Sequence, residues 1–351
     1  MGSDRALLAA PLQKQVFGWH PYWEGTAYTN YDFSVLSTVA YFSYEVNPAS
    51  GGYLDIHQWT TTPLVGMAQT NGVKVVLAVT CFGNADNQAL LNNDAAKTNL
   101  IAELARLVKL RNADGVNIDF EGITDSGLRS QVTGFMTNLA ARFHSEIPGS
   151  QVSIDLPAVD WAGVFDVPAL SAAIDLLIIM GYDYHWAGGP NAGPVAPFRQ
   201  SATWGSLCVQ RSVSNYLSAG ASPGKLILGV PYYGYEWPTE SLELNASTTG
   251  SATTRVYPEA ISRASTYGRR WDASSSVPYF FTGTTGHYTQ CWYDDEESLG
   301  EKYDYVVQRG IGGIGIWALG YDEDRSELWR LLADKFAAPA DEWTAQNAGT
   351  T

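Results

Sequence analysis

The sequence predicts an α/β fold, a closed (β/α)8 TIM barrel, with a small α+β insertion between its seventh and eighth strands. Two observations predict it. Short runs rich in β-branched and aromatic residues alternate with stretches of helical periodicity along most of the 351 residues, and parallel strands need such helical crossovers. Eight of these units favour a closed barrel over an open sheet.

The eight expected strands follow one another along the chain with helical patterns between them. A helical stretch ending in an Asn-Gly pair, a common helix stop, precedes the third strand. Helices near 97–110 and 128–147 flank the fourth strand, and the second of them stops at a Pro-Gly pair. The strands are expected at 15–23, 36–46, 73–83, 114–122, 151–161, 174–186, 225–237 and 311–322.

The last third of the chain departs from this simple alternation. The segment after the seventh strand is too long for one crossover helix, and it contains alternating apolar patterns, turn signals and a helix near 297–309. A last helix is expected at about 324–336, with Asp324 as its N-cap. The expected division is 12–237 and 306–337 for the barrel, 238–305 for the insertion and 338–351 for a tail or linker rich in small and polar residues.

Composition narrows the classes of partner. The chain has 36 acidic and 21 basic residues, a net charge of -15, which argues against nucleic acid and anionic membranes because both are bound through Lys and Arg. A neutral or cationic substrate suits this charge. No apolar run reaches the ~18 residues of a membrane span. The 12 Trp and 20 Tyr fit either a large core or stacking on the apolar faces of sugar rings.

The cysteines, histidines and N-terminus carry weaker signals. Cys81, Cys208 and Cys291 lack CxxC spacing, so no metal site or redox motif is expected, while one disulfide or none is possible. No histidine cluster has the spacing of metal ligands, and no cofactor is expected. No signal peptide is visible in MGSDRALLAAPL, whose first three residues resemble a cloning junction.

The run DGVNIDFEG at 114–122 alternates polar with apolar side chains, and period two is typical of a strand. The alternative, an exposed antiparallel edge strand with a solvated polar face, does not suit a parallel barrel whose strands are covered on both sides. In a barrel the outward face packs against helices, and the inward face leads to the open C-terminal end. We therefore expect Val116, Ile118 and Phe120 to point outward and Asn117, Asp119 and Glu121 inward, with Glu121 highest.

The same run resembles the DxxDxDxE signature of glycoside hydrolase family 18, the chitinase family. Three further motifs resemble the family in the correct order: MGYD at 180–183, LGVPYYGYEW at 228–237 and GGIGIWALGYD at 312–322. One departure matters, because the family's middle aspartate is Asn117 here. An aspartate there can share a proton with its neighbour, whereas asparagine cannot ionise, so we expect Asp119 to remain an anion more readily than in relatives.

The resemblance implies a retaining mechanism assisted by the substrate, an exception among retaining glycosidases. The 2-acetamido carbonyl of the bound sugar attacks its own anomeric carbon and gives an oxazolinium ion. By resemblance Glu121 is the acid and then the base, Asp119 holds the acetamido group, and Asn117 supports Asp119. Tyr182 donates its hydroxyl to the acetamido oxygen, and Asp183 contacts the same region of the sugar.

The resemblance also implies a set of substrate-binding side chains. Trp317 is expected to form the apolar floor under the reacting sugar, although a plug in the barrel core is the alternative. Trp19 and Tyr233 are expected as wall residues, and core packing explains either of them almost as well. The remaining expected substrate-binding residues are Met180, Trp186, Tyr235 and Phe42.

The expected function is cleavage of β-1,4-linked N-acetylglucosamine polymers such as chitin by a monomeric enzyme. One alternative is an N-acetylglucosaminidase that acts on peptidoglycan or the N-glycan core, since GWHPYW and YYGYEW resemble the branch linked to bacterial cell walls and spores. Another is a lectin-like member without catalysis, but such members usually lose the acid, and Glu121 is present. Secretion is expected because such polymers lie outside the cell.

Overall fold

The computed structural model describes residues 11–338. Its centre is a closed barrel of eight parallel strands, because β1 pairs with β14 on one side and with β2 on the other. A short strand, β3 (Tyr53–Asp55), adds to β2 in the antiparallel sense. The barrel strands are β1 (Gln15–Pro21), β2 (Thr38–Val46), β4 (Lys74–Phe82), β5 (Gly115–Glu121), β6 (Gln151–Leu156), β7 (Leu176–Met180), β8 (Leu226–Pro231) and β14 (Gly313–Trp317). The predicted barrel is confirmed.

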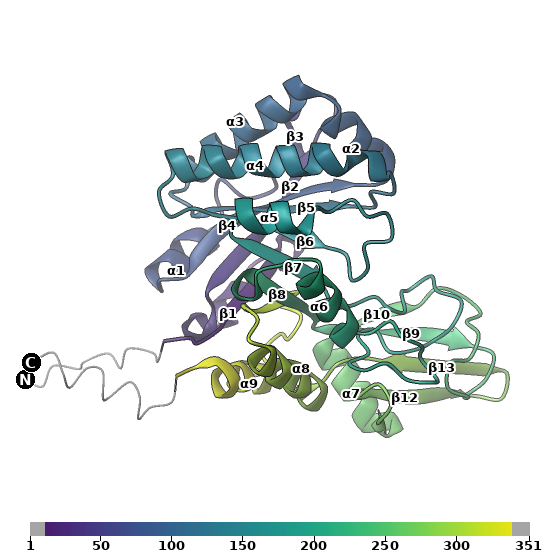
Figure 1. Cartoon of the computed structure of the whole chain (residues 1–351). Coiled ribbons are helices and arrows are strands. Elements are labelled where there is room, and N and C mark those ends of the chain that lie inside the picture. The colour runs from purple at the N-terminus through teal and green to yellow at the C-terminus, as the bar shows by residue number, and fades with distance from the viewer. Residues whose placement is uncertain (1–10, 339–351) are drawn as a thin grey trace, which may run out of the picture.

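Helices surround this barrel, as Figure 1 shows. The outward side chains of β5 belong to the main apolar core, where Phe120 stacks on Phe135 of α4 with ring centroids 5.6 Å apart. Within 11–338, no helix is both long enough and apolar enough to cross a membrane. The helices are α1 (Leu64–Thr70), α2 (Asn84–Leu91), α3 (Asp94–Leu110), α4 (Arg129–Glu146), α5 (Val167–Ala173), α6 (Val209–Ser218), α8 (Glu296–Arg309) and α9 (Glu327–Phe336).

The predicted α+β insertion is a second sheet between β8 and β14, with five antiparallel strands in the order β10-β9-β13-β12-β11 and one helix. In Figure 1 it extends to one side of the barrel. Its elements are β9 (Tyr233–Thr239), β10 (Thr253–Val256), α7 (Tyr257–Tyr267), β11 (Arg270–Asp272), β12 (Val277–Thr284) and β13 (His287–Trp292).

Several element boundaries differ from the prediction, and the strands expected at 174–186 and 311–322 already end at Met180 and Trp317. The run expected as one seventh strand divides at Tyr232 into β8 and β9, which belong to different sheets. The strand expected at 151–161 ends at Leu156, before a proline that lacks the N–H a ladder needs. Asp324 is not the N-cap of the last helix, which begins after Ser326, because the preceding residues form tight turns.

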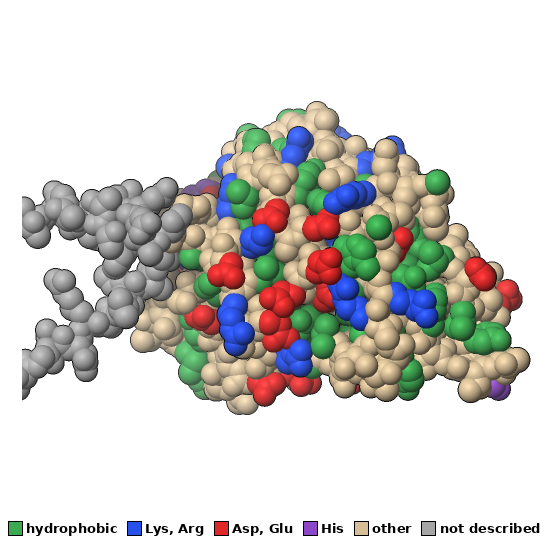
Figure 2. All heavy atoms as spheres, turned by 90° about the horizontal axis from the view of Figure 1, so that it is seen from below, with side chains coloured by type: hydrophobic (Ala, Val, Ile, Leu, Met, Phe, Trp, Pro, Cys, Tyr) green, Lys and Arg blue, Asp and Glu red, His purple; other side chains and the backbone are tan. Residues whose placement is uncertain are grey.

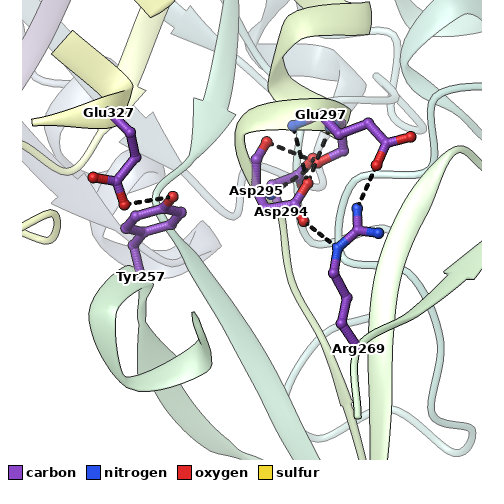
Figure 3. Close-up of polar contacts among 7 residues, drawn as sticks. Tyr257, Arg269, Asp294, Asp295, Glu297 and Glu327 are labelled. Carbon is purple, nitrogen blue, oxygen red and sulfur yellow. Dashed lines mark hydrogen bonds and ion pairs between the residues drawn. The ribbon is translucent and has the colours of Figure 1, made fainter. Parts of the chain in front are cut away.

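Polar contacts join the insertion to helices α8 and α9. Arg269 forms ion pairs of 2.7 Å with both Asp295 and Glu297 at the start of α8, and the Tyr257 hydroxyl donates to Glu327 of α9 at 3.2 Å (Figure 3). Figure 2, a view from below, shows acidic and basic side chains interspersed over this side of the molecule. The insertion is therefore fixed to the barrel by charged groups as well as by the continuous chain.

The three cysteines are all free thiols and all buried. Of the two possibilities that the sequence leaves open, the structure therefore has no disulfide among Cys81, Cys208 and Cys291.

Candidate active site in the barrel mouth

The three polar side chains of β5 point into the barrel and climb toward its open end. Asn117 is fully buried, Asp119 is 6% exposed, and Glu121 is the exposed end of the row. Asp119 and Glu121 line a cleft of about 690 Å³, and Asn117 lies beneath it. The period-two pattern thus places one carboxyl above another at the carboxyl end of a barrel strand, where active sites of this architecture lie.

Asn117 is held by three hydrogen bonds. The indole Nε1 of Trp19 donates to its Oδ1 at 2.7 Å, and its Nδ2 donates to Ser153 Oγ at 3.1 Å and to Asp155 Oδ1 at 2.9 Å. An indole N–H can only donate, so the atom that faces Trp19 must be the amide oxygen. The nitrogen must then face β6, and the orientation of the amide is fixed by its neighbours.

Asp119 carries a buried Oδ1 that has no hydrogen-bond partner among the described residues. Burial raises the pKa of Asp119 well above its usual range, and the negative charges of Glu121 and Asp155 raise it further. The expectation that an asparagine at position 117 leaves Asp119 more readily ionised than in relatives stays a prediction, because this rise is measured from an ordinary aspartate and not from a relative. A carboxyl from the neighbouring strand, Asp155, supplies a negative charge beside Asp119 that the sequence motif lacks.

Glu121 is exposed at the end of the row and lines the cleft, where the surrounding protein removes part of its hydration. This desolvation raises the pKa of Glu121, and the negative charge of Asp183 adds to the effect. A carboxyl whose pKa is raised keeps its proton closer to neutral pH, as a general acid requires. The environment of Glu121 therefore suits proton donation to a bound substrate.

Asp183 faces Glu121 from the segment after β7 and has a left-handed backbone, with φ of 58°. Its carboxylate accepts hydrogen bonds from the hydroxyls of Tyr233 at 2.5 Å and Tyr235 at 3.1 Å. Burial raises the pKa of Asp183, and these two hydrogen bonds oppose the rise. A non-glycine residue in this backbone region is uncommon, and such strain is concentrated at functional sites.

Tyr182 lies among the carboxyls of the cleft. Burial raises the pKa of its hydroxyl well above 10.0, and the charges of Asp155, Asp119, Glu121 and Asp183 raise it further. The hydroxyl therefore keeps its proton and can donate it in a hydrogen bond. Gly229 on the neighbouring strand β8 leaves room for the Tyr182 ring because it has no side chain. A Cβ at Gly229 would lie 3.3 Å from this ring and 2.6 Å from a carbonyl oxygen.

Aromatic rings form the floor of the cleft around Trp317. Its ring centroid lies 5.0 Å from that of Phe42, 6.1 Å from Trp19 and 6.4 Å from Trp23, all in edge-to-face geometry. The Phe42-Ser43 and Trp317-Ala318 peptide bonds are cis. Trp19 is only 2% exposed, so it packs in the barrel core and holds Asn117 while its edge reaches the cleft.

The structure brings together most of the predicted site residues, and their roles stay predictions. Trp186 does not line the cleft: its side chain is 53% exposed, and its carbonyl accepts a hydrogen bond from the Trp237 indole. The predicted residues that line the cleft are Trp19, Phe42, Asp119, Glu121, Met180, Tyr182, Asp183, Tyr233, Tyr235 and Trp317.

Several cleft residues were missed by the sequence reasoning. Asp155 had a usable signal, because QVSIDL at 151–156 repeats the alternation of the fourth strand and places Ser153 and Asp155 on its inward face. Others come from loops or strand ends whose folding has no periodic signature. These further lining residues are Tyr22, Trp23, Ser43, Glu45, Val46, Leu54, Thr80, Cys81, Phe82, Asp86, Thr254 and Tyr321.

Comparison with known proteins finds relatives that match most of the chain. The chain is 28% identical over 339 residues to di-N-acetylchitobiase of Rattus norvegicus, covering 86% of this chain and 84% of that protein. It is 25% identical over 314 residues to the cortical fragment-lytic enzyme of Bacillus anthracis, covering 86% and 68%.

Solved structures share the fold. A GH18 chitinase from Cycas revoluta in complex with (GlcNAc)3 superposes with a TM-score of 0.80 at 19% identity, covering 92% of this chain and 99% of that one. The model of the family described as glycosyl hydrolases family 18 matches residues 15–322. Since this match spans nearly all of the barrel and its insertion, the chain belongs to glycosyl hydrolases family 18.

Proposed function

We propose that this family 18 glycosidase hydrolyses β-1,4-linked N-acetylglucosamine oligomers with retention, through an oxazolinium intermediate formed by the substrate. One observation carries the proposal: the buried, unpartnered oxygen of Asp119 lies on the same inward row as Glu121, whose raised pKa suits an acid. The related chitobiase and the Cycas chitinase bound to (GlcNAc)3 support this substrate class.

The first step of the proposed reaction breaks the glycosidic bond. Glu121 gives its proton to the leaving oxygen while the acetamido carbonyl oxygen attacks the anomeric carbon from the opposite face. The side of the Asp119 carboxyl that lines the cleft accepts the acetamido N–H and stabilises the positive charge that develops on the ring. Tyr182 donates its hydroxyl to the acetamido oxygen, and its raised pKa keeps that proton in place.

The second step opens the oxazolinium ion. Glu121, now a carboxylate, takes a proton from water, and the hydroxide oxygen bonds to the anomeric carbon as the acetamido oxygen leaves. Two inversions at the same carbon give net retention, as in other retaining glycosidases. Trp317 offers its apolar face to the sugar ring throughout, within the aromatic floor that Phe42 and Trp19 support.

A second candidate substrate is peptidoglycan, which the similarity to a cortical fragment-lytic enzyme supports. The charge of the cleft favours neutral oligomers instead. Ordinary muramic acid carries a lactyl carboxylate or a peptide with further acids, and like charges repel. No Lys, Arg or His is among the described residues that line the cleft, and six carboxyls are: Glu45, Asp86, Asp119, Glu121, Asp155 and Asp183.

Because chitin also lies outside the cell that degrades it, we further propose that the enzyme is secreted.

The variant Glu121→Gln tests the proposed function. It removes the acid but keeps the shape of the side chain, so we expect turnover of N-acetylglucosamine tetramers to fall by about 10²–10⁴-fold, while calorimetry still detects tetramer binding. Glu103→Gln on α3, which loses only a surface pair with Arg106, is the matched control. Turnover in Glu121→Gln close to that of the control would overturn the assignment.

Two further measurements separate the alternatives. Product analysis on chitin oligomers beside purified peptidoglycan compares the two candidate substrates directly. A thiazoline analogue of the oxazolinium ion should inhibit competitively if the acetamido group is the nucleophile. A wild-type enzyme indifferent to this analogue would contradict substrate assistance, and a wild type that binds tetramers without cleaving them would instead indicate a lectin-like member.

A further inference from the structure

The strand next to β5 carries an acidic residue at the level of Asp119. In the parallel pair, Asn117 is opposite Ser153 and Ile118 is opposite Ile154, so the same register continued by one residue brings Asp155 beside Asp119. Neighbouring strands lie about 4.8 Å apart, and side chains of the same parity share a face. Asp155 is 3% exposed and reaches the floor of the cleft.

The hydrogen bonds of Asn117 define what Asp155 can do. Because Trp19 fixes the amide orientation, the Asn117 nitrogen donates to Asp155 Oδ1. That oxygen is therefore an acceptor, and a proton on Asp155 must sit on its other oxygen. Asn117 itself has no proton to exchange, so it can hold its neighbours but cannot change its charge as they titrate.

Resting on the proposed substrate-assisted reaction, we propose that Asp155 supplies the carboxyl that position 117 lacks, as a positioning residue that shares one proton with Asp119. Before substrate binds, the proton resides on Asp119. When the acetamido N–H reaches the side of the Asp119 carboxyl that lines the cleft, the proton passes from Asp119 to the second oxygen of Asp155, and Asp119 becomes the anion that the oxazolinium ion needs. One O–H bond breaks and one forms, so the charge of the pair does not change.

The surroundings of the pair support a shared proton. Glu121 on β5 raises the pKa of both members of the pair, and the pair in turn raises the pKa of Tyr182 at the end of β7. Burial raises the pKa of Asp155 well above its usual range and the Glu121 charge adds to this, while the hydrogen bond from Asn117 opposes it. No basic side chain lines the cleft to neutralise the described carboxyls, so a proton is the available counter-charge.

The variant Asp155→Asn separates proton sharing from simple support. Its amide oxygen can still accept the hydrogen bond from Asn117, but it cannot take up a proton. The exchange variant Asn117→Asp with Asp155→Asn returns one carboxyl to the layer beneath Asp119, where Trp19, Ser153 and the new amide can all donate to it. Asp114→Asn is the matched control, since Asp114 lies on the same chain segment at the far end of the barrel and keeps an oxygen for the Val75 N–H.

Two readouts decide the proposal. In steady-state kinetics with N-acetylglucosamine tetramers, Asp155→Asn should lower kcat at least about tenfold with KM within about threefold, and the exchange variant should recover most of that loss. Asp114→Asn should stay within about threefold of wild type. In ¹³C NMR of labelled aspartate, Asp155→Asn should lower the pKa of Asp119, because a neighbouring negative charge is removed.

The proposal is overturned if Asp155→Asn keeps kcat within about threefold of wild type, if the exchange brings no gain over Asp155→Asn, or if the Asp119 titration does not move. A wild type that cleaves no tetramer would refute the proposed function. The NMR titration needs no turnover, so it would still decide whether Asp155 is paired with Asp119. Thermal unfolding is measured for each variant. If Asp155→Asn does not fold, the exchange variant alone tests the proposal. Turnover of the exchange variant within about tenfold of wild type supports the proposal, and a greater loss of turnover overturns it.

Discussion

At the scale of single residues, the pH dependence of the reaction depends on how Asp183 acts on Glu121. The acid must be protonated, so activity is lost as pH rises through the pKa of Glu121. Burial raises that pKa first, and the Asp183 charge raises it further. Removing the charge with Asp183→Asn therefore lowers the pKa of Glu121, and the alkaline limb of the kcat/KM profile on N-acetylglucosamine tetramers should move to lower pH.

The matched control for this shift is Asp86→Asn. Asp86 also lines the cleft, but it does not contribute to the raised pKa of Glu121. The alkaline limb of Asp86→Asn should coincide with that of the wild type. An equal displacement in both variants would mean that the overall cleft charge sets the limb, and the specific pairing of Asp183 with Glu121 would be wrong.

The sequence predicted the acid, its neighbour and their order along β5 because alternation and barrel geometry are both local rules. It did not predict the charge state of Asp119. That property depends on burial first, then on the Glu121 charge and on Asp155, which is distant in the sequence and adjacent only through the pairing of β5 with β6. The expectation drawn from Asn117 considered β5 alone, whereas the charged neighbours of Asp119 include a carboxyl on the next strand.

At the scale of elements, one residue at the start of α8, Asp295, has two roles. It caps the helix, and it binds the insertion. Asp295 accepts the backbone N–H groups of Glu297 and Ser298, at 3.1 and 3.2 Å, in a capping box, and it also pairs with Arg269 (Figure 3). Asp295→Ala should lower the free energy of unfolding by about 1–2 kcal/mol, as loss of an N-cap does. Chemical denaturation followed by circular dichroism measures the change.

Glu297→Ala is the control for this prediction. It removes the other partner of Arg269, but Glu297 has a side chain that is 58% exposed and does not cap the helix. Exposed pairs contribute about 0–1 kcal/mol, so this variant should be the less destabilised of the two. If both variants lose the same stability, the cap contributes nothing and the ion pairs alone hold α8.

Element boundaries were harder to predict than the elements themselves. The run at 225–237 is continuous in its apolar pattern, yet β8 pairs with β7 and β14, while β9 pairs with β10 and β13. Which sheet a residue joins is decided by partners distant in the sequence, and no local signal marks the change at Tyr232. The last helix differs for a local reason, since the Arg325 N–H bonds to the Asp322 carbonyl in a turn that passes the expected cap at Asp324.

At the scale of the whole molecule, the net charge of -15 and the acidic cleft act in the same direction. An anionic saccharide meets a repulsive field both as it approaches and once it is bound, whereas a neutral oligomer meets none. The barrel concentrates this effect, because a cleft lined by one sign of charge between low-dielectric walls focuses the field. Substrate charge should therefore govern the rate through encounter and binding.

Ionic strength tests this property of the whole molecule. Raising salt from about 10 mM to about 300 mM shortens the screening length from about 30 Å to below 10 Å. The kcat/KM for neutral N-acetylglucosamine tetramers should hardly change over this range, whereas that for soluble muropeptides bearing carboxylates should rise from a low value as repulsion is screened. If kcat/KM for muropeptides falls as salt rises, an attractive cationic surface must lie near the cleft. Peptidoglycan would then be the preferred candidate substrate. If kcat/KM for tetramers varies with salt as strongly as kcat/KM for muropeptides, salt acts on the ionisation of the carboxyls in the site. The pH profile, and not the charge of the substrate, then explains the salt dependence.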